Sequence, residues 1–274
     1  MTTHFGLIII GDEILSGKRA DKHLPKAIEL LAARGLSLSY AHYVGDDPAR
    51  ITATLAGAFA AARDFGDVVF SCGGIGATPD DHTRQCAARA LGVDMVLHPE
   101  AKALITERMH DTAREQGIPF DADRPDNIHR LNMGVFPAGA RIVPNPFNKI
   151  PGFSCRSGIG AVHFLPGFPV MAWPMMASVL DTHYADLHQS AAYAEKSVIV
   201  MGSMEATLTP LMIEIETAHT GVKVFSLPSV DHPIYGRHIE LGVKGSPGAV
   251  EAAFAALLSG LKLFQVELGP ELVR

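Results

Sequence analysis

Apolar runs alternate with helical patterns along the first two-thirds of the chain. Phe5–Ile10 is an apolar run and predicts a buried strand. The next apolar residues recur at helical spacing: Leu24, Ala27, Ile28 and Leu31. This helix is predicted to end near Gly35, because glycine is common just after a helix C-terminus. Residues 36–44 then predict a second strand.

Asp47 and Pro48 open the next predicted helix, with Asp47 as the N-cap and Pro48 in the first helical position. Its apolar stripe comprises Ile51, Leu55 and Phe59. Residues 67–72 form a short apolar run bounded by glycines, which is typical of a central parallel strand.

The remaining elements of this part are predicted in the order helix 79–91, strand 95–98, helix 99–116, loop 117–130, short strands and turns over 134–151, strand 161–165 and helix 168–185. Such alternation predicts an α/β fold with a mostly parallel sheet and helices on both faces.

The pattern restarts around residues 187–194. The tail predicts strand 195–201, helix 205–219, strands 222–227 and 238–243, and helix 248–266. We therefore expect two domains, a larger one over residues 1–185 and a small β-α-β-β-α domain over residues 186–274.

The composition and charge of the chain indicate which classes of protein it fits. Hydrophobic residues make up 47% of the 274 residues and charged residues 19%, as in a globular protein with a core. The net charge is −6 and no Lys/Arg run occurs, so we expect no nucleic-acid partner. The apolar stretch 161–180 is interrupted by three prolines, which disfavours a membrane span. Without a signal-peptide pattern or a disulfide framework among three cysteines, the expected location is the cytoplasm.

A glycine-rich turn follows the predicted strand 67–72. Gly73, Gly74 and Gly76 allow close backbone approach, and Thr78-Pro79 are predicted to start a helix whose free N–H groups favour an anion. The position beyond a strand carboxyl end is where parallel sheets bind ligands. The turn is therefore a candidate phosphate site, although it has neither the GxGxxG nor the Walker spacing.

Asp80 and Asp81 follow this turn and allow two interpretations. Adjacent carboxylates beside a phosphate can hold Mg²⁺. Alternatively, Thr78 is the N-cap, Asp81 completes a capping box, and Asp80 complements the helix dipole. Both interpretations remain open at this stage.

Gly11-Asp12-Glu13 after the first strand is a second candidate, since its acids could face the same cleft. It could equally be a solvated turn. Asp46-Asp47 after the second strand is a weaker candidate, because capping accounts for Asp47.

Several motifs in this order resemble the N-terminal region of the CinA (competence/damage-inducible protein A) family, within the MoaB/Mog molybdopterin-binding superfamily. They are Gly11-Asp12-Glu13-Ile14-Leu15-Ser16-Gly17, Val44-Gly45-Asp46-Asp47, the glycine turn through Asp81, Asn145-Pro146, Pro151-Gly152-Phe153 and Leu165-Pro166-Gly167-Phe168-Pro169. The tail resembles the small domain of CinA-like proteins through residues 201–205 and 226–229.

The resemblance implies a three-layer α/β domain of MoaB/Mog type that binds molybdopterin in some members. In CinA-like members it implies metal-dependent hydrolysis of the diphosphate in ADP-ribose, with Mg²⁺ as the expected metal. It also implies a homo-oligomer. The chain shows no amidase domain before Arg274, so no deamidation of nicotinamide mononucleotide is expected.

The resemblance assigns roles residue by residue. It assigns phosphate or ligand contacts to Gly11, Gly73, Gly74, Gly76 and Thr78, and it places Gly152 and Gly167 in the loops that close the site. Metal binding falls to Asp12, Glu13 and Asp80, and the catalytic acids are Asp80 and Asp81. Lys149 departs from the family pattern, and it would either contact phosphate or narrow the pocket.

Three hypotheses follow: a metal-dependent nucleotide diphosphate hydrolase, a molybdopterin-binding protein of molybdenum cofactor biosynthesis, and a non-catalytic ligand-binding module.

Overall fold

The computed structural model describes residues 3–188 and 194–273. The chain divides into two compact units, Met1–His188 and Gln189–Arg274. The segment 187–194, where the sequence predicts a restart, lies partly outside the described residues.

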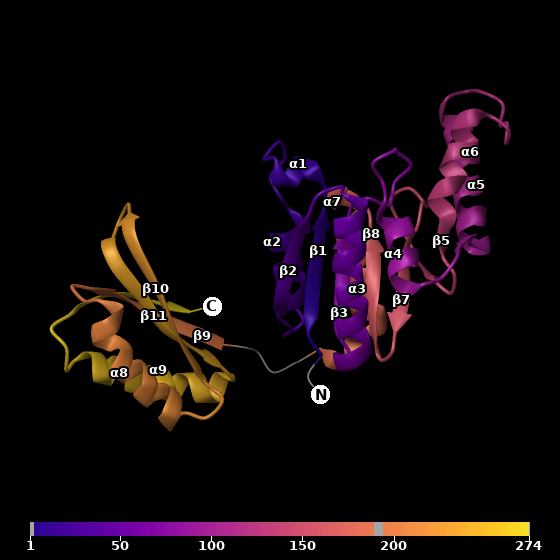
Figure 1. Ribbon diagram of the computed structural model, residues 1–274. Coiled ribbons are helices and arrows are strands. Elements are labelled where there is room, and N and C mark those ends of the chain that lie inside the picture. Colours follow the sequence, from indigo (N-terminus) through magenta and orange to yellow (C-terminus); the bar gives the residue numbers. More distant parts are fainter. Residues whose placement is uncertain (1–2, 189–193, 274) are drawn as a thin grey trace. The chain divides into compact units, whose positions relative to one another are not determined.

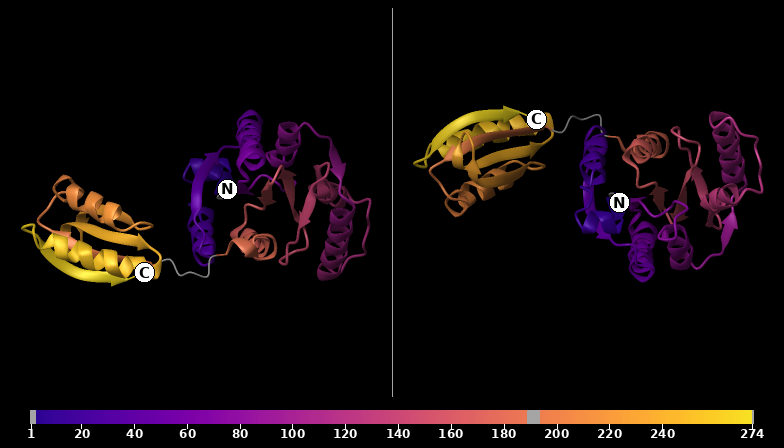
Figure 2. Two further views of the ribbon diagram at one scale, coloured as in Figure 1. Left: turned by 90° about the horizontal axis from the view of Figure 1, so that it is seen from below. Right: turned by 90° about the horizontal axis from the view of Figure 1, so that it is seen from above.

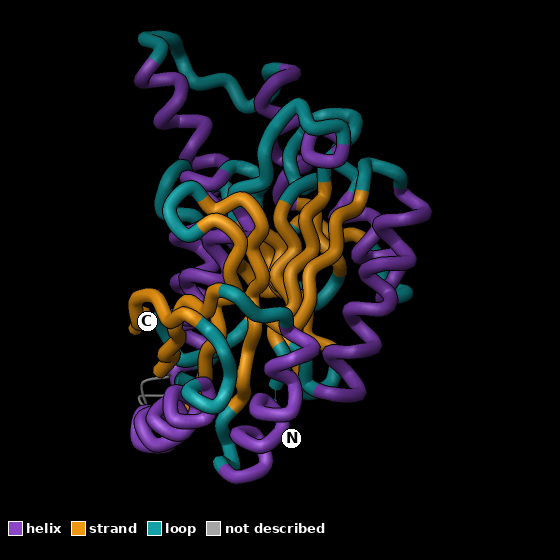
Figure 3. The backbone as a smooth tube through the Cα atoms, turned by 90° about the vertical axis from the view of Figure 1, so that its left-hand side faces the viewer, coloured by secondary structure: helices purple, strands orange, loops and turns teal. Residues whose placement is uncertain are grey.

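The larger unit contains a six-stranded sheet in the order β2-β1-β3-β8-β7-β6. Figure 3 shows its strands, in orange, side by side between helices, in purple. Its strands are β1 (Phe5–Ile10), β2 (Leu38–Val44), β3 (Val68–Cys72), β6 (Arg141–Val143), β7 (Gly152–Ser157) and β8 (Gly160–Leu165). The strands β2, β1, β3 and β8 pair in parallel, and β7 is antiparallel to both of its neighbours. The prediction of a mostly parallel sheet is therefore confirmed. A separate antiparallel pair joins β4 (Met95–Leu97) to β5 (Val135–Pro137).

Helices cover both faces of this sheet, as the end-on views of Figure 2 show. They are α2 (His23–Ala32), α3 (Pro48–Phe65), α4 (Thr83–Leu91), α5 (Pro99–Glu115) and α7 (Pro169–His183). Because side chains alternate along a strand, Ile8 and Ile10 of β1 join the core under α3, α4 and α5, whereas Leu7 and Ile9 join the core under α2 and α7. Every residue of β1 is buried. A strand that is covered on both faces has an uninterrupted apolar sequence.

The start of α3 is as predicted. Pro48 occupies the first turn, and the Asp47 carboxylate accepts a hydrogen bond of 2.8 Å from the Arg50 N–H. The stripe formed by Ile51, Leu55 and Phe59 is buried.

We predict that Asp47→Ala lowers the free energy of unfolding by about 1 kcal/mol, because one N–H of the first turn loses its partner. Asp47→Asn should leave stability nearly unchanged, since asparagine caps as well as aspartate. Urea unfolding of both variants measures the difference, and equal loss in the two would contradict the capping role.

Three predicted details are wrong. The helix predicted from residue 79 begins at Thr83, because Asp81 Oδ2 accepts hydrogen bonds from the Thr78 N–H (2.8 Å) and hydroxyl (2.5 Å) and closes a turn ahead of the helix. The predicted loop 117–130 contains α6 (Pro125–Leu131), whose proline stands in the first turn, where helices tolerate it. The strand β7 was not predicted, because its alternating burial is short and follows a proline-rich segment.

The smaller unit has an antiparallel sheet in the order β10-β11-β9-β12. Its elements are β9 (Ala194–Met201), α8 (Glu205–Ala218), β10 (Lys223–His232), β11 (Gly236–Gly245), α9 (Pro247–Leu261) and β12 (Glu267–Val273). Figure 1 shows α8 and α9 against one face of this sheet, where they share one apolar core with it. The predicted β-α-β-β-α order lacks the final strand, β12. The helix predicted over residues 248–266 ends at Leu261 in the structure, and the chain then continues into β12.

None of the helices within residues 3–188 and 194–273 is long and apolar enough to cross a membrane.

Candidate functional site

A cavity of about 450 Å³ lies at the carboxyl ends of β1, β3 and β8. The loops after these strands line it, together with Arg19, Asp46, Met133 and the loop between β6 and β7. The strands β2 and β3, which follow β1 in the chain, pair on opposite sides of it. The connections therefore diverge at β1 and leave a crevice, which is where open α/β sheets bind ligands.

The start of α4 holds the glycine turn in place. The Thr83 hydroxyl donates to the Gly73 carbonyl and the Thr83 N–H to the Gly74 carbonyl, each at 3.0 Å. The Arg84 guanidinium donates to the Gly76 carbonyl at 2.7 Å. The turn is thus fixed through its carbonyl groups.

This anchoring determines where the N–H groups of the turn point. Residues 3–188 contain no cis peptide bond, and in a trans peptide the N–H is directed opposite to the preceding C=O. The N–H groups of Gly74, Ile75 and Ala77 therefore point away from α4, and all three residues line the cavity. Within the described residues no hydrogen bond uses these N–H groups. Successive free N–H groups of this kind form an anion-binding concavity.

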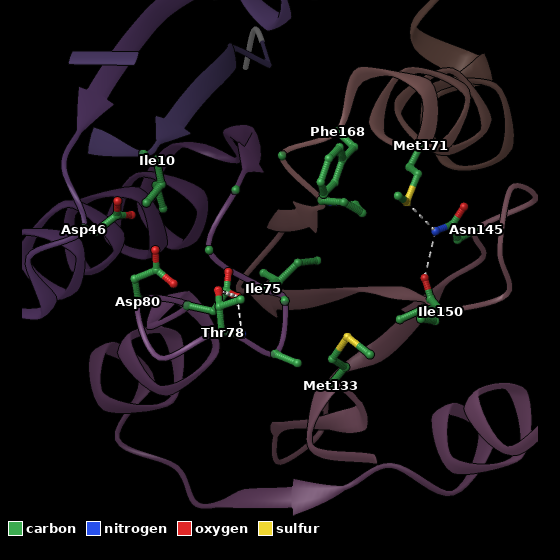
Figure 4. Close-up of a pocket in the computed structure, with 18 of the residues that line it drawn as sticks. Ile10, Asp46, Ile75, Thr78, Asp80, Met133, Asn145, Ile150, Phe168 and Met171 are labelled. Carbon is green, nitrogen blue, oxygen red and sulfur yellow. Dashed lines mark hydrogen bonds between the residues drawn. The ribbon is translucent and has the colours of Figure 1, made fainter. Parts of the chain in front are cut away.

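Carboxylates form a second wall. Glu13, Asp46 and Asp80 line the cavity, and Figure 4 shows Asp46 and Asp80 on the same side of it. Two reciprocal hydrogen bonds tie Asp46 to Asp12: Asp46 Oδ2 accepts from the Asp12 N–H at 2.9 Å, and Asp12 Oδ1 accepts from the Asp46 N–H at 3.1 Å. They join the loop after β1 to the loop after β2.

The two aspartates that face the cavity differ in acidity. Burial raises the pKa of Asp46 above the usual aspartate value, against a backbone hydrogen bond from Asp12 that lowers it, and the charges of Asp12, Glu13 and Asp80 raise it further. The pKa of Asp80 is lowered, first by the nearby Thr78 side chain and then by its own backbone N–H. Asp46 is therefore the stronger base, and Asp80 the more persistently charged group.

The donor set suits a hard cation, but it is not assembled into a closed site. Carboxylate oxygens are the ligands that Mg²⁺ prefers. Burial is the main cause of the raised pKa of Asp46, and the negative charges of Asp12, Glu13 and Asp80, which a cation would offset, raise it further. Among the described residues, no three His, Cys, Asp or Glu side chains converge closely enough to hold a metal by themselves. Mg²⁺ is commonly bound by one or two carboxylates together with substrate phosphates, and this arrangement fits that mode.

The opposite side of the cavity is largely apolar. Its side chains include Ile75, Met133, Ile150, Phe168 and Met171, most of them facing Asp46 and Asp80 across the cavity in Figure 4. Phe168 is 57% exposed, so its ring face is accessible. This side suits a flat aromatic group.

Two asparagines shape the apolar side. Asn145 is buried, and its amide donates to the Ile150 carbonyl at 2.9 Å and to Asn148 Oδ1 at 2.8 Å, which folds the loop between β6 and β7. Among the described residues, the Asn148 amide nitrogen donates only to Met171 Sδ, at 3.5 Å, so it retains a hydrogen to donate to a ligand.

The structure brings most of the predicted site residues together. The predicted residues that line the cavity are Gly11, Glu13, Gly73, Gly74, Gly76, Thr78, Asp80, Asp81 and Gly167. Asp12, Lys149 and Gly152 are not among the lining residues.

Two of the residues outside the cavity have other partners. The Lys149 ammonium pairs with Glu107 at 2.5 Å and Asp111 at 2.7 Å on α5, which accounts for it without a ligand. A Cβ on Gly152 would lie 2.3 Å from the Phe164 carbonyl oxygen, so this glycine allows β7 to approach β8.

Sequence reasoning missed Arg19 and Met133 on the cavity wall. Neither belongs to a local motif. Arg19 is the only Lys or Arg among the lining residues, and the chain brings it to the cavity through the turn that follows α1 (Asp12–Leu15).

Comparison with known proteins gives consistent matches. A family model described as "Probable molybdopterin binding domain" matches residues 6–189. A protein of Pyrobaculum calidifontis is 29% identical over 93% of this chain and 95% of its own length. A CinA-like protein of Mycobacterium marinum is also 29% identical, over 90% of this chain, and the chain spans 57% of that relative.

One solved structure shares the fold over 65% of this chain. The crystal structure of CinA from Thermoplasma acidophilum, a protein of unknown function, superposes with a TM-score of 0.54 at 25% identity, over 65% of this chain and 98% of that chain. The structure of MoaB from Thermus thermophilus, a molybdopterin biosynthesis enzyme, gives a TM-score of 0.42 at 21% identity, over 68% of this chain and 96% of that chain.

Proposed function

Because this chain belongs to the molybdopterin-binding domain family as a CinA-like protein, we propose that its cavity binds and hydrolyses a nucleotide diphosphate of the ADP-ribose class. One observation carries the proposal. The free N–H groups of Gly74, Ile75 and Ala77 and the carboxylates of Glu13, Asp46 and Asp80 line one cavity.

These two groups favour opposite charges. The N–H groups attract a phosphate, whereas the carboxylates repel it unless a divalent cation lies between them. A phosphorylated ligand that binds together with Mg²⁺ is attracted both by the N–H groups and by the carboxylates. Glu13 and Asp80 are the residues that would hold the metal, which would supply positive charge to the diphosphate oxygens.

Different groups of the cavity hold the substrate and accept the proton during hydrolysis. The turn N–H groups hold one phosphate in place, and the apolar side around Phe168 and Met171 stacks on the base. Water attacks the other phosphorus, the P–O–P bond breaks, and Asp46 accepts the proton as the stronger base.

Molybdopterin binding is the second candidate function. The apolar side and the Asn148 amide also suit a pterin ring, and the turn N–H groups suit its phosphate. This candidate requires no turnover, so the carboxylates would have no catalytic task.

Thermal unfolding with ligands separates these candidates. We expect ADP-ribose with Mg²⁺ to raise the melting temperature, because a ligand that binds only the native state stabilises it by linkage. Adenosine, which lacks phosphate, should raise it far less. A shift with a pterin phosphate and none with ADP-ribose would favour the second candidate, and no shift with either would contradict both.

A further inference from the structure

Among the residues that the structure describes, Arg84 is a buried cation without a carboxylate partner. It lies in the first turn of α4 with 4% of its surface exposed. Its guanidinium donates to two neutral acceptors, the Gly76 carbonyl at 2.7 Å and the Asn132 carbonyl. No ion pair within the described residues includes it, and its Nε–H has no partner there.

Such an arrangement is energetically unfavourable by itself. Burying a charge without a partner of opposite charge is costly even after the surroundings relax. Burial accordingly lowers the pKa of Arg84, and the Asp81 charge opposes this only in part. An anion bound close by would offset the cost, and the turn that Arg84 holds is the phosphate-binding candidate.

We propose that Arg84 is the positioning residue of the phosphate subsite and adds its buried positive charge to the turn N–H groups. The inference rests on the proposed function, because it assumes that the turn binds phosphate. The bond to the Gly76 carbonyl directs the Ala77 N–H away from α4. The same guanidinium holds Asn132, which precedes the lining residue Met133, so one side chain fixes two walls of the cavity.

The charge acts through the peptide that it polarises. A guanidinium hydrogen-bonded to a carbonyl strengthens the dipole of that peptide, and its N–H becomes a better donor to an anion. Contact between Arg84 and the ligand is not required. Affinity should therefore depend on the charge of the ligand, which a purely structural role would not produce.

The test compares two variants with a matched control. Arg84→Lys keeps the charge but not the forked geometry, and Arg84→Gln keeps a donor without the charge. Arg89→Gln makes the same substitution at an exposed position of α4 outside the cavity. Calorimetric titration with pyrophosphate, ADP-ribose and adenosine, each with Mg²⁺, gives the affinities, and thermal unfolding checks that each variant is folded.

We expect Arg84→Gln to weaken pyrophosphate and ADP-ribose binding by about tenfold to a hundredfold, the scale of a lost interaction with a charged group. Adenosine affinity should change less than twofold. Arg84→Lys should lie between Arg84→Gln and the wild type, and Arg89→Gln should match the wild type.

Other outcomes overturn the inference. Equal losses for adenosine and pyrophosphate, or equal losses in Arg84→Gln and Arg84→Lys, would make the role structural. Unchanged pyrophosphate affinity in Arg84→Gln would contradict the inference while leaving the proposed function intact. A wild-type protein that binds neither phosphate probe would contradict both.

Discussion

Replacing Gly74 with valine is expected to abolish binding of ADP-ribose. Gly74 has a φ of +67°, which L side chains rarely adopt, and a Cβ there would lie 2.2 Å from the Thr83 hydroxyl oxygen. The side chain would displace Thr83, whose hydroxyl and N–H hold the Gly73 and Gly74 carbonyls. The turn N–H groups would then no longer point together.

Gly92 provides a matched control. Its φ is +68°, and a Cβ there would meet no atom within 4 Å. Gly92→Val should therefore destabilise the protein by the backbone strain alone, about 1 to 3 kcal/mol, and leave binding intact. Calorimetric titration of both variants below their melting temperatures makes the comparison. If the two variants bind ADP-ribose with similar affinity, the turn does not bind phosphate.

Replacing Asp80 with asparagine is expected to lower Mg²⁺-dependent turnover of ADP-ribose by at least about a hundredfold. Asparagine keeps the size and most of the hydrogen bonding but removes the charge that a hard cation prefers. Asp80 is exposed and lies outside any helix, so the loss of stability should be small.

Asp47→Asn is the matched control for the loss of one negative charge near the cavity. It removes one carboxylate next to Asp46, outside the cavity, and preserves the cap of α3. We expect its turnover to stay within about twofold of the wild type, because Asp47 has no part in the cavity. Measuring initial rates at saturating Mg²⁺ for both variants decides the question. Normal turnover by Asp80→Asn would leave Asp46 and Glu13 as the functional acids.

The sequence predicts an element well where one local interaction decides it. The run Phe5–Ile10 indicates a strand because both faces of β1 are covered, and Asp47-Pro48 indicates a helix start because capping needs only neighbouring residues. The strand order is a long-range property, and strand–helix alternation indicates only that most of the strands pair in parallel. The motif order further indicated the family, which the family-model match confirms.

Local patterns fail where two local interactions compete. Thr78, Pro79 and Asp81 have the composition of a capping box, yet the Asp81 carboxylate closes a turn before α4 instead. The same residue types satisfy both arrangements. The outcome depends on Thr83 and Arg84, which hold the glycine turn and set where the helix begins.

Distant partners account for the other differences at the site. Lys149 was predicted to be a candidate phosphate ligand, but Glu107 and Asp111 of α5 pair with it. Arg84 carries no signal in the sequence, because its significance depends on burial without a carboxylate partner. Such properties follow from the packing of the chain and not from local spacing.

The most direct measurement of the central claim is ³¹P NMR of ADP-ribose incubated with the wild-type protein and Mg²⁺. We expect the diphosphate signals to disappear and the signals of two phosphate monoesters, AMP and ribose 5-phosphate, to replace them. The conversion should stop when EDTA is added. Diphosphate signals that broaden through binding but persist without conversion would contradict hydrolysis and leave the cavity a binding site only.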